Sequence, residues 1–213
     1  MGLKIVTPPT VTPISVVGID NLKEHLQVAT DVSDDDALIT VYLNAAWALA
    51  EAHTWRQFLT AAYRYTLLDF TAQRPSERHR MGSILIPRPA LQSIVSVEYL
   101  DGDGATVELV EDTDFIVDDE NDIGAIWPAI DTSWPAVRRN HPKAVTITYT
   151  AGYGDTLADM PDMLLHAVKL QVGSWWMNRE SVSEKAMKEL PAATKALLEV
   201  IEVRDDRLVT DSI

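Results

Sequence analysis

The spacing of hydrophobic residues changes along this chain, from helical near both ends to strand-like in the middle. After residue 36, apolar side chains recur with the spacing of one helical face, at Leu38, Val41, Tyr42, Ala45 and Leu49. In residues 145–150, valine, isoleucine and tyrosine alternate with threonine, which is the two-residue period of a strand with one buried face. The pattern predicts an α+β protein, with a helical body and an inserted antiparallel sheet region.

A long apolar helix is predicted over residues 161–180, after a glycine turn that follows the strand at 145–150. Pro161 suits the first turn of this helix because proline lacks the N–H that has no partner there, and Asp159 suits its cap. The apolar stripe is wide, with Leu164, Val168, Val172 and Trp175 along its centre. We therefore expect the helix to pack on more than one side.

The second long helix is predicted to begin at Ser33 and to end near Thr54. Ser33 is expected to cap it, and the following Asp34, Asp35 and Asp36 suit its positive end. Its many alanines permit another helix to approach closely, and the helix at 161–180 is the expected partner. A shorter helix is expected over residues 19–28.

The region between the long helices has the pattern of short strands. They are predicted at residues 63–70, 84–86, 93–99, 105–110 and 115–117. The run Asp101-Gly102-Asp103-Gly104 predicts a tight hairpin turn, and it fails as a calcium loop because Thr106 stands where a glycine is required. Residues 126–143 are expected to form an irregular loop, in which Trp127 and Trp134 close over the sheet edge.

These elements predict an order of segments along the chain. The prolines at 8, 9 and 13 favour an extended, helix-free arm, and Pro191 starts a last helix whose apolar side holds Leu197, Leu198 and Ile201. The expected segments are an arm (1–18), a core (19–190, with helices at 19–54, a β-rich insertion at 63–150 and the helix at 161–180) and a C-terminal helical arm (191–213).

Composition narrows the range of partners. The chain has 18 Lys and Arg against 32 Asp and Glu, a formal charge of -14, which disfavours nucleic acid and anionic membranes. The absence of cysteine excludes disulfides, thiolate zinc sites and cysteine nucleophiles. No apolar run approaches the ~20 residues of a membrane span, so we expect a soluble, unexported protein.

The sequence contains no recognisable catalytic or cofactor motif. The five histidines fall on separate segments, and neither a P-loop nor a Gly-x-Ser-x-Gly elbow occurs. Gly152-Tyr153-Gly154 follows a strand, but Leu157 replaces the third glycine of a dinucleotide fingerprint. We expect no enzyme activity, no cofactor and no metal; a hydrolase with a carboxylate pair remains a hypothesis because carboxylates are numerous.

Several stretches taken together resemble the head-tail connector, or adaptor, family of long-tailed phages and phage-derived gene transfer agents. The resemblance covers about residues 19–200, and neither end of the chain shares it. It rests on LKEHLQVATDVSDDDALI (22–39), AAWALAEAHTWRQFL (45–59), ILIPRPALQSIVSVEYLDGDGATVEL (84–109), VTITYTAGYGD (145–155) and MPDMLLHAVKLQVGSWWMNRES (160–181).

The resemblance implies a non-enzymatic virion protein of the neck, assembled in the bacterial cytoplasm. Such a protein forms a ring, expected to be dodecameric, between the portal of the head and the stopper or tail-completion protein, and DNA only passes through it. The resemblance also implies that the helix from Pro191 docks on the portal. The expected docking residues are Leu197, Leu198, Ile201, Arg204 and Arg207.

Charge adds candidates for the ring itself. Residues 98–122 contain eleven acidic residues and no basic one, and an acidic lumen would let DNA slide instead of holding it. A solvated acidic face is the equal alternative. Basic residues of one subunit could also meet carboxylates of the next. The inter-subunit or lumen candidates are Arg74, Arg78, Arg80, Asp101, Asp103, Glu111 and Asp112.

A second function stays open from the residues. A DNA-packaging accessory protein that contacts nucleic acid would use residues 74–80 with Arg138, Arg139 and Lys143 as a basic spot. Its DNA binding would weaken steeply with salt.

Overall fold

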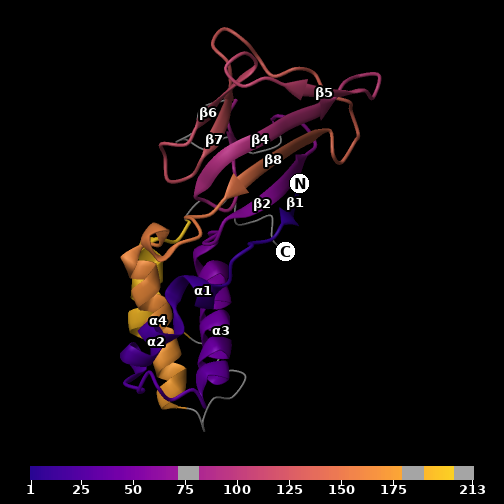
Figure 1. Cartoon of the computed structure of the whole chain (residues 1–213). Coiled ribbons are helices and arrows are strands. Elements are labelled where there is room, and N and C mark those ends of the chain that lie inside the picture. The colour runs from indigo at the N-terminus through magenta and orange to yellow at the C-terminus, as the bar shows by residue number, and fades with distance from the viewer. Residues whose placement is uncertain (72–81, 179–189, 204–213) are drawn as a thin grey trace. The chain divides into compact units, whose positions relative to one another are not determined.

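The computed structural model describes residues 1–71, 82–178 and 190–203, and the chain is a mixture of helices and antiparallel sheet, as predicted (Figure 1). It divides into two compact units. The strand unit contains Met1–Pro9 and Thr60–Tyr153, and the helical unit contains Thr10–Leu59 and Gly154–Val203. In the described part of the chain, no helix combines the length and the apolar character that crossing a membrane requires.

The strand unit consists of two antiparallel sheets. The larger has the order β1-β2-β8-β4-β5, and the smaller has the order β3-β7-β6. The strands are β1 (Gly2–Thr7), β2 (Ala61–Leu67), β3 (Ile84–Leu85), β4 (Leu91–Leu100), β5 (Thr106–Leu109), β6 (Phe115–Asp118), β7 (Ala125–Pro128) and β8 (Val145–Ala151). Each predicted strand is therefore present, with β8 where the valine–threonine alternation placed it.

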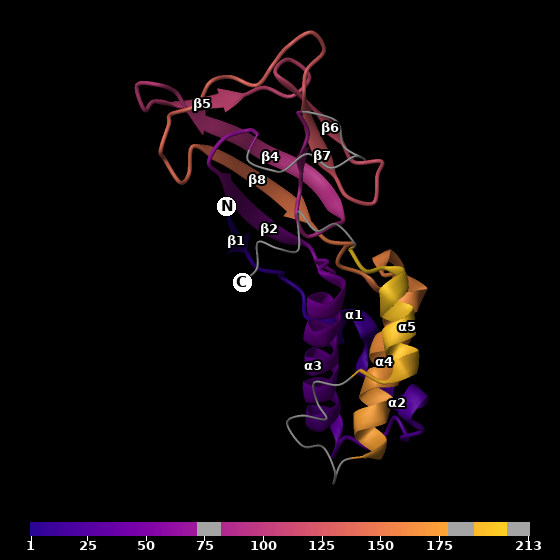
Figure 2. The ribbon, with the colours of Figure 1, turned by 180° about the vertical axis from the view of Figure 1, so that it is seen from behind.

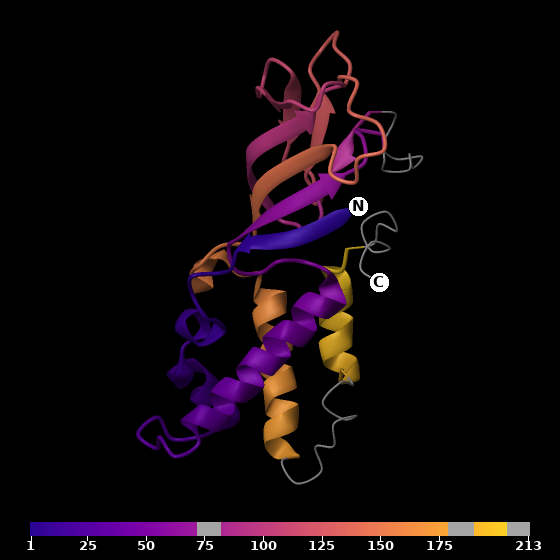
Figure 3. The same ribbon diagram turned by 90° about the vertical axis from the view of Figure 1, so that its right-hand side faces the viewer.

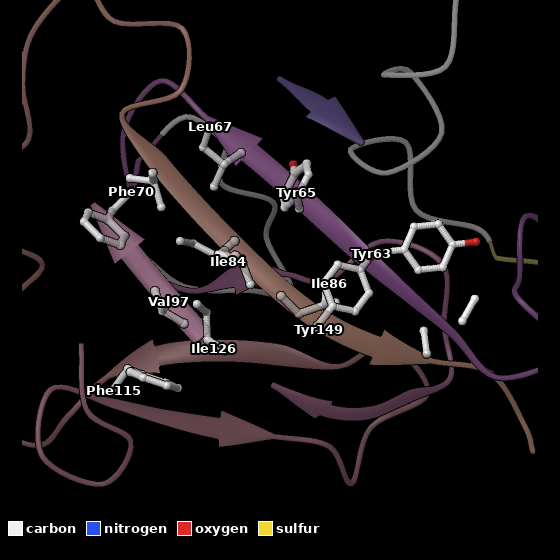
Figure 4. Close-up of a cluster of buried hydrophobic side chains, with 14 residues drawn as sticks. Tyr63, Tyr65, Leu67, Phe70, Ile84, Ile86, Val97, Phe115, Ile126 and Tyr149 are labelled. Atoms are coloured by element: carbon white, nitrogen blue, oxygen red, sulfur yellow. The ribbon is translucent and has the colours of Figure 1, made fainter. Parts of the chain in front are cut away.

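The core of the strand unit lies between the two sheets (Figure 4). Alternate residues of β2 and β8 are buried, among them Tyr65 and Ile147, and they face Ile84, Phe115 and other residues from the smaller sheet. Tyr149 is fully buried, and its ring stacks on that of Tyr63 with centroids 5.6 Å apart. Successive side chains of a strand point to opposite faces of a sheet, so the threonines that alternate with these buried residues lie on the opposite, polar face.

The helical unit contains five α-helices in the described residues. They are α1 (Pro13–Val17), α2 (Ile19–Leu26), α3 (Asp36–Thr54), α4 (Asp162–Met177) and α5 (Ala192–Val200). Helices α3 and α4 pack on each other, and Figure 3 shows α3 running obliquely across α4. The buried face of α3 is turned from the predicted stripe, because Val41 is 57% exposed whereas Ile39, Ala46 and Ala50 are buried. Tyr42, which the stripe did include, meets Trp175 of α4 with ring centroids 5.9 Å apart.

A partly buried ion pair lies at the start of α3. The Lys23 side chain on α2 is 2% exposed, and its Nζ lies 2.6 Å from Oδ1 of Asp36 at the first turn of α3. The same ammonium group donates to the carbonyl of Thr30 at 3.3 Å. Asp36 therefore provides the counter-charge for the buried Lys23 ammonium, which would destabilise the folded protein if it were left unpaired.

Helix α5 lies beside α4 within the helical unit (Figure 2). Leu198 is fully buried and Val203 is 4% exposed. The chain after α5 is bound to the end of α3 and to the residues just beyond it, because the Val203 N–H donates to the Thr54 carbonyl at 3.0 Å and Arg56 Nε donates to the Ile201 carbonyl. Leu198 and Val203 thus belong to the core of the unit.

The prediction of a helix-free arm over residues 1–18 is wrong. Gly2–Thr7 is extended, but it pairs with β2 as an edge strand, and Pro13–Val17 forms a short helix. Thr12 caps this helix: its hydroxyl accepts from the Ser15 N–H at 3.4 Å, and Ser15 bonds back to the Thr12 N–H. Pro13 is the first residue of this helix, where proline is well tolerated because its missing N–H would have no partner. The prediction treated the three prolines only as residues that prevent helix formation.

Three local predictions also need correction. The N-cap of α3 is Asp35, not Ser33, and its side chain makes no capping hydrogen bond. Asp159 completes a capping box with Thr156 on a short 3₁₀ turn, Leu157–Asp159, whereas Pro161 precedes α4. Trp127 lies in β7, so residues 126–143 are not wholly irregular. Trp134 does close over the core, stacked on Phe70 with centroids 4.6 Å apart.

Candidate subunit interface

The predicted hairpin between β4 and β5 is confirmed, and Asp101 forms its turn. The Asp101 carboxylate accepts from the N–H groups of Asp103 and Ala105, at 3.0 and 2.9 Å. This use of the side chain is that of an Asx turn. Asp101 is half-buried and its carboxylate already accepts hydrogen bonds within the turn, whereas the Asp103 side chain is exposed. Of these two interface candidates, Asp103 is the one that presents a carboxylate to a partner.

Glu111 and Asp112 lie in the tight turn between β5 and β6. Asp112 has a φ of 65°, a conformation that aspartate tolerates better than most residues, and its N–H donates to the Phe115 carbonyl at 2.8 Å. Asp114 closes the turn by accepting from the Val110 N–H at 2.8 Å. Both Glu111 and Asp112 expose their side chains, so this turn presents two further carboxylates.

The basic candidates are only partly within the described residues. Arg74, Arg78 and Arg80, and likewise Arg204 and Arg207, lie outside the described ranges. Arg138 Nη1 donates to the Asp103 carbonyl at 3.3 Å, and the same guanidinium packs against Gly104, where an added Cβ would meet it at 1.8 Å. Arg138 therefore packs against the acidic hairpin and donates a hydrogen bond to its backbone.

The candidate docking residues on α5 differ in how deeply they are buried. Leu198 is fully buried and holds α5 in the helical unit, while Leu197 and Ile201 are half-buried. Sequence reasoning did not single out Val200, which is 64% exposed. Residues three and four apart on a helix are neighbours, so Leu197, Val200 and Ile201 form one accessible apolar strip. We refer to these three residues as the α5 strip.

A groove of about 460 Å³ lies between α2, α4 and α5 in the helical unit. Its described lining is mostly apolar and includes Leu26, Leu170, Trp176 and Met177. His25 is the ionisable residue there; burial lowers the pKa of its imidazole, and nearby Lys169 lowers it further. This lining holds no carboxylate, so the groove does not have the converging acids that a carboxylate-pair hydrolase needs. In the described ranges, no three potential ligands from His, Asp and Glu gather as a metal site would require.

Comparison with known proteins gives a match of structure without a match of sequence. No family model matches the chain, and no curated protein does. A chain in "Neck of empty GTA particle computed with C6 symmetry" is similar with a TM-score of 0.70 and 21% identity, and one in "Virion of native gene transfer agent (GTA) particle" with 0.70 and 20%. The chain shares its fold with these particle proteins. A chain in "Neck of native GTA particle computed with C12 symmetry" gives 0.65 and 20%.

The similarity covers nearly the whole of both molecules. In each of the three cases the match includes 96% of this chain and 97% of the other. It therefore includes both the strand unit and the helical unit. The resemblance to gene transfer agent neck proteins that the sequence motifs indicated is thus confirmed at the level of the fold.

Proposed function

We propose that the protein is a non-enzymatic structural component of a particle neck, forming a ring that joins the portal of the head to the stopper or tail-completion protein. The observation that carries this proposal is the shared fold over 96% of the chain with a chain of a gene transfer agent neck. The neck structure computed with C12 symmetry supports a ring of twelve copies. Such a ring belongs at the head-tail interface of a phage-like particle.

The exposed carboxylates suit a channel for DNA. Asp103 on the β4–β5 turn and Glu111 and Asp112 on the β5–β6 turn are exposed, and the chain carries a net charge of -14. Carboxylates around a lumen repel phosphate groups, so DNA passes without adhering. DNA is then cargo in transit and not a bound partner. Residues 74–80 and their arginines are proposed to contact carboxylates of the neighbouring copy.

The portal contact is assigned to the end of the chain that follows Pro191. Leu198 anchors α5 in the helical unit, and the α5 strip leaves apolar surface available beside it. Leu197 and Ile201 would supply the apolar part of the contact, and Arg204 and Arg207 would supply its charges. Apolar residues together with arginine are a common composition of protein interfaces.

The test combines imaging with two kinds of variant. Electron microscopy of the purified chain, alone and with its portal protein, should reveal rings, and a ring on the portal should be lost when the chain ends at Val203. This truncation is preferable to removal of the whole of residues 191–213, because that would also remove the buried Leu198. Leu197→Asp should weaken portal binding, and Ala196→Asp, at the neighbouring exposed position of α5, is the control.

Two outcomes would contradict this account. A truncated chain that still decorates portals would remove the docking role from the C-terminal segment. A chain that forms no ring but binds DNA, with an affinity whose logarithm falls linearly with log salt, would replace the neck ring by a DNA-packaging accessory.

A further inference from the structure

The polar face of the large sheet carries opposite charges at its two edges. We call this face, which lies opposite the buried tyrosines, the outer face. On the β1 side, Lys4 pairs in register with Arg64 of β2; on the β5 side, Glu98 of β4 pairs in register with Glu108. Lys4, Arg64 and Glu108 are exposed, and Glu98 is half-buried. The residues between these pairs are uncharged, chiefly Thr146 and Thr148 of β8 and Ser96 of β4.

Each of these pairs is unfavourable within a single chain. Side chains directly opposite each other on neighbouring antiparallel strands are close together, and like charges in that arrangement destabilise the sheet. This chain has one such pair of cations and one such pair of carboxylates on the same face. Stability of the isolated sheet therefore does not account for them.

The two pairs cannot neutralise each other within one copy. Arg64 is on β2 and Glu98 is on β4, and β8 lies between these strands. Two strand spacings amount to about 9.5 Å, well beyond the ~4 Å of a salt bridge. Among the described residues, neither Lys4 and Arg64 nor Glu98 and Glu108 take part in an ion pair. A second molecule is therefore a suitable source of counter-charges for both pairs.

The strand order makes a second copy of this chain a suitable partner. Strands β1 and β5 form the two opposite edges of the described sheet, so the cationic pair and the acidic pair lie on opposite sides of the unit. Strand β1 also exposes Ile5 and Val6, at 45% and 44%. An exposed apolar edge strand is a liability unless another chain covers it. A contact between the β1 side of one copy and the β5 side of the next would bring opposite charges together. It would also cover the exposed apolar residues of the β1 edge.

We propose that neighbouring copies meet along the edges of this sheet, with the β1 side of one copy beside the β5 side of the next, so that Lys4 and Arg64 of one copy lie beside Glu98 and Glu108 of the other. This inference rests on the proposed ring. Each copy uses two different patches, so the contact is heterologous, and repeated rotation closes it into a ring. The charges specify which edges meet and the direction in which copies follow one another, because like edges repel.

Charge reversal tests this contact without changing the like-charged pairing inside the chain. One variant is Lys4→Glu with Arg64→Glu, and the other is Glu98→Lys with Glu108→Lys. The concentration at which half of the chain is in rings should rise about tenfold or more in each variant, as measured by sedimentation velocity at low salt. An equimolar mixture of the two variants should restore rings, because an even-numbered ring can alternate them. The variant with all four reversals should also assemble.

Matched controls separate the contact from net charge. Arg139→Glu with Lys143→Glu makes the same change in charge as the Lys4 and Arg64 reversal, at exposed residues outside the sheet, and should leave assembly within twofold of the wild type. If the wild type forms rings and both outer-face variants form them equally well, the inference is wrong and the neck function stands. If the Lys4 and Arg64 reversal reduces only DNA binding, the cationic pair binds nucleic acid and the inference is again wrong. If the wild type forms no ring, alone or on portals, both proposals fail.

Discussion

Tyr149 provides a quantitative test of the core of the strand unit. Its side chain is fully buried, and its hydroxyl donates to the carbonyl of Pro87 at 2.7 Å. Burial raises the pKa of this hydroxyl well above its ordinary value of 10.0, and neighbouring Tyr63 and Tyr65 raise it further. Tyr149→Phe removes the hydrogen bond and the titrating group together while it keeps the ring.

At neutral pH the variant should be less stable than the wild type. The lost hydrogen bond contributes about 1 kcal/mol, and the stacking of the ring on Tyr63 is retained. The free energy of unfolding of the strand unit should therefore fall by about 1 kcal/mol at pH 7. A loss above about 3 kcal/mol would indicate that the ring itself had moved, as in a substitution that opens a cavity.

At high pH the order should reverse. Above pH ~10 the tyrosine of the unfolded chain loses its proton while folded Tyr149 keeps it, so the unfolded chain binds fewer protons and stability falls as the pH rises. One such group costs the wild type up to about 1.4 kcal/mol per pH unit, until the pH reaches the folded pKa. Phenylalanine at 149 avoids this loss. The two stability curves should cross near pH ~11.

Urea unfolding followed by circular dichroism at pH 7, 10 and 11 measures the difference. Other titrating groups are present in both proteins, so their effects cancel. Thr148→Val, at the next position of β8 and on the outer face, changes no titrating group and should differ from the wild type by an amount that does not depend on pH. A Tyr149→Phe difference that stays constant from pH 7 to 11 would refute the assignment of Tyr149 as a buried, neutral tyrosine.

Three further predictions concern the helical unit, and urea unfolding checks each of them. Trp175→Ala should cost about 3–5 kcal/mol, because Trp175 is 4% exposed and packs on Tyr42; a cost below 1 kcal/mol would contradict its role in the core. Asp36→Asn should cost about 1–3 kcal/mol, since it leaves the buried Lys23 ammonium without its counter-charge while Asp36 itself is 34% exposed; adding Lys23→Met should recover most of the loss, and no recovery would contradict this reasoning. Thr194→Val should raise stability by about 1 kcal/mol, because the buried Thr194 hydroxyl has no hydrogen-bond partner in the described part of the chain; a loss of stability would show that this hydroxyl is bonded.

The order of elements could be predicted from the sequence because each element has a local signal. The threonine alternation in β8 and the Asp-Gly pairs after β4 fix a strand and a turn through interactions between near neighbours. The wide apolar stripe of α4 and the alanines of α3 likewise indicated two helices that pack together, and Trp175 does meet Tyr42.

The features that escaped prediction depend on contacts between distant residues. The pairing of Gly2–Thr7 with β2 joins positions about sixty residues apart, and nothing in the first seven residues identifies that partner. The opposite charges of the outer face become visible only when the register places Lys4 beside Arg64 and Glu98 beside Glu108. Leu198 was expected to dock on a partner, but an apolar residue on a helix has the same pattern whether it packs inside its own chain or against another.

Imaging of complete particles tests the central proposal most directly. Cryo-electron microscopy of particles produced from the genome that encodes this chain should show a ring of twelve copies between the portal and the tail, with the strand unit and the helical unit both fitting the density. Particles with an intact neck that contains no density for this fold would contradict the proposal.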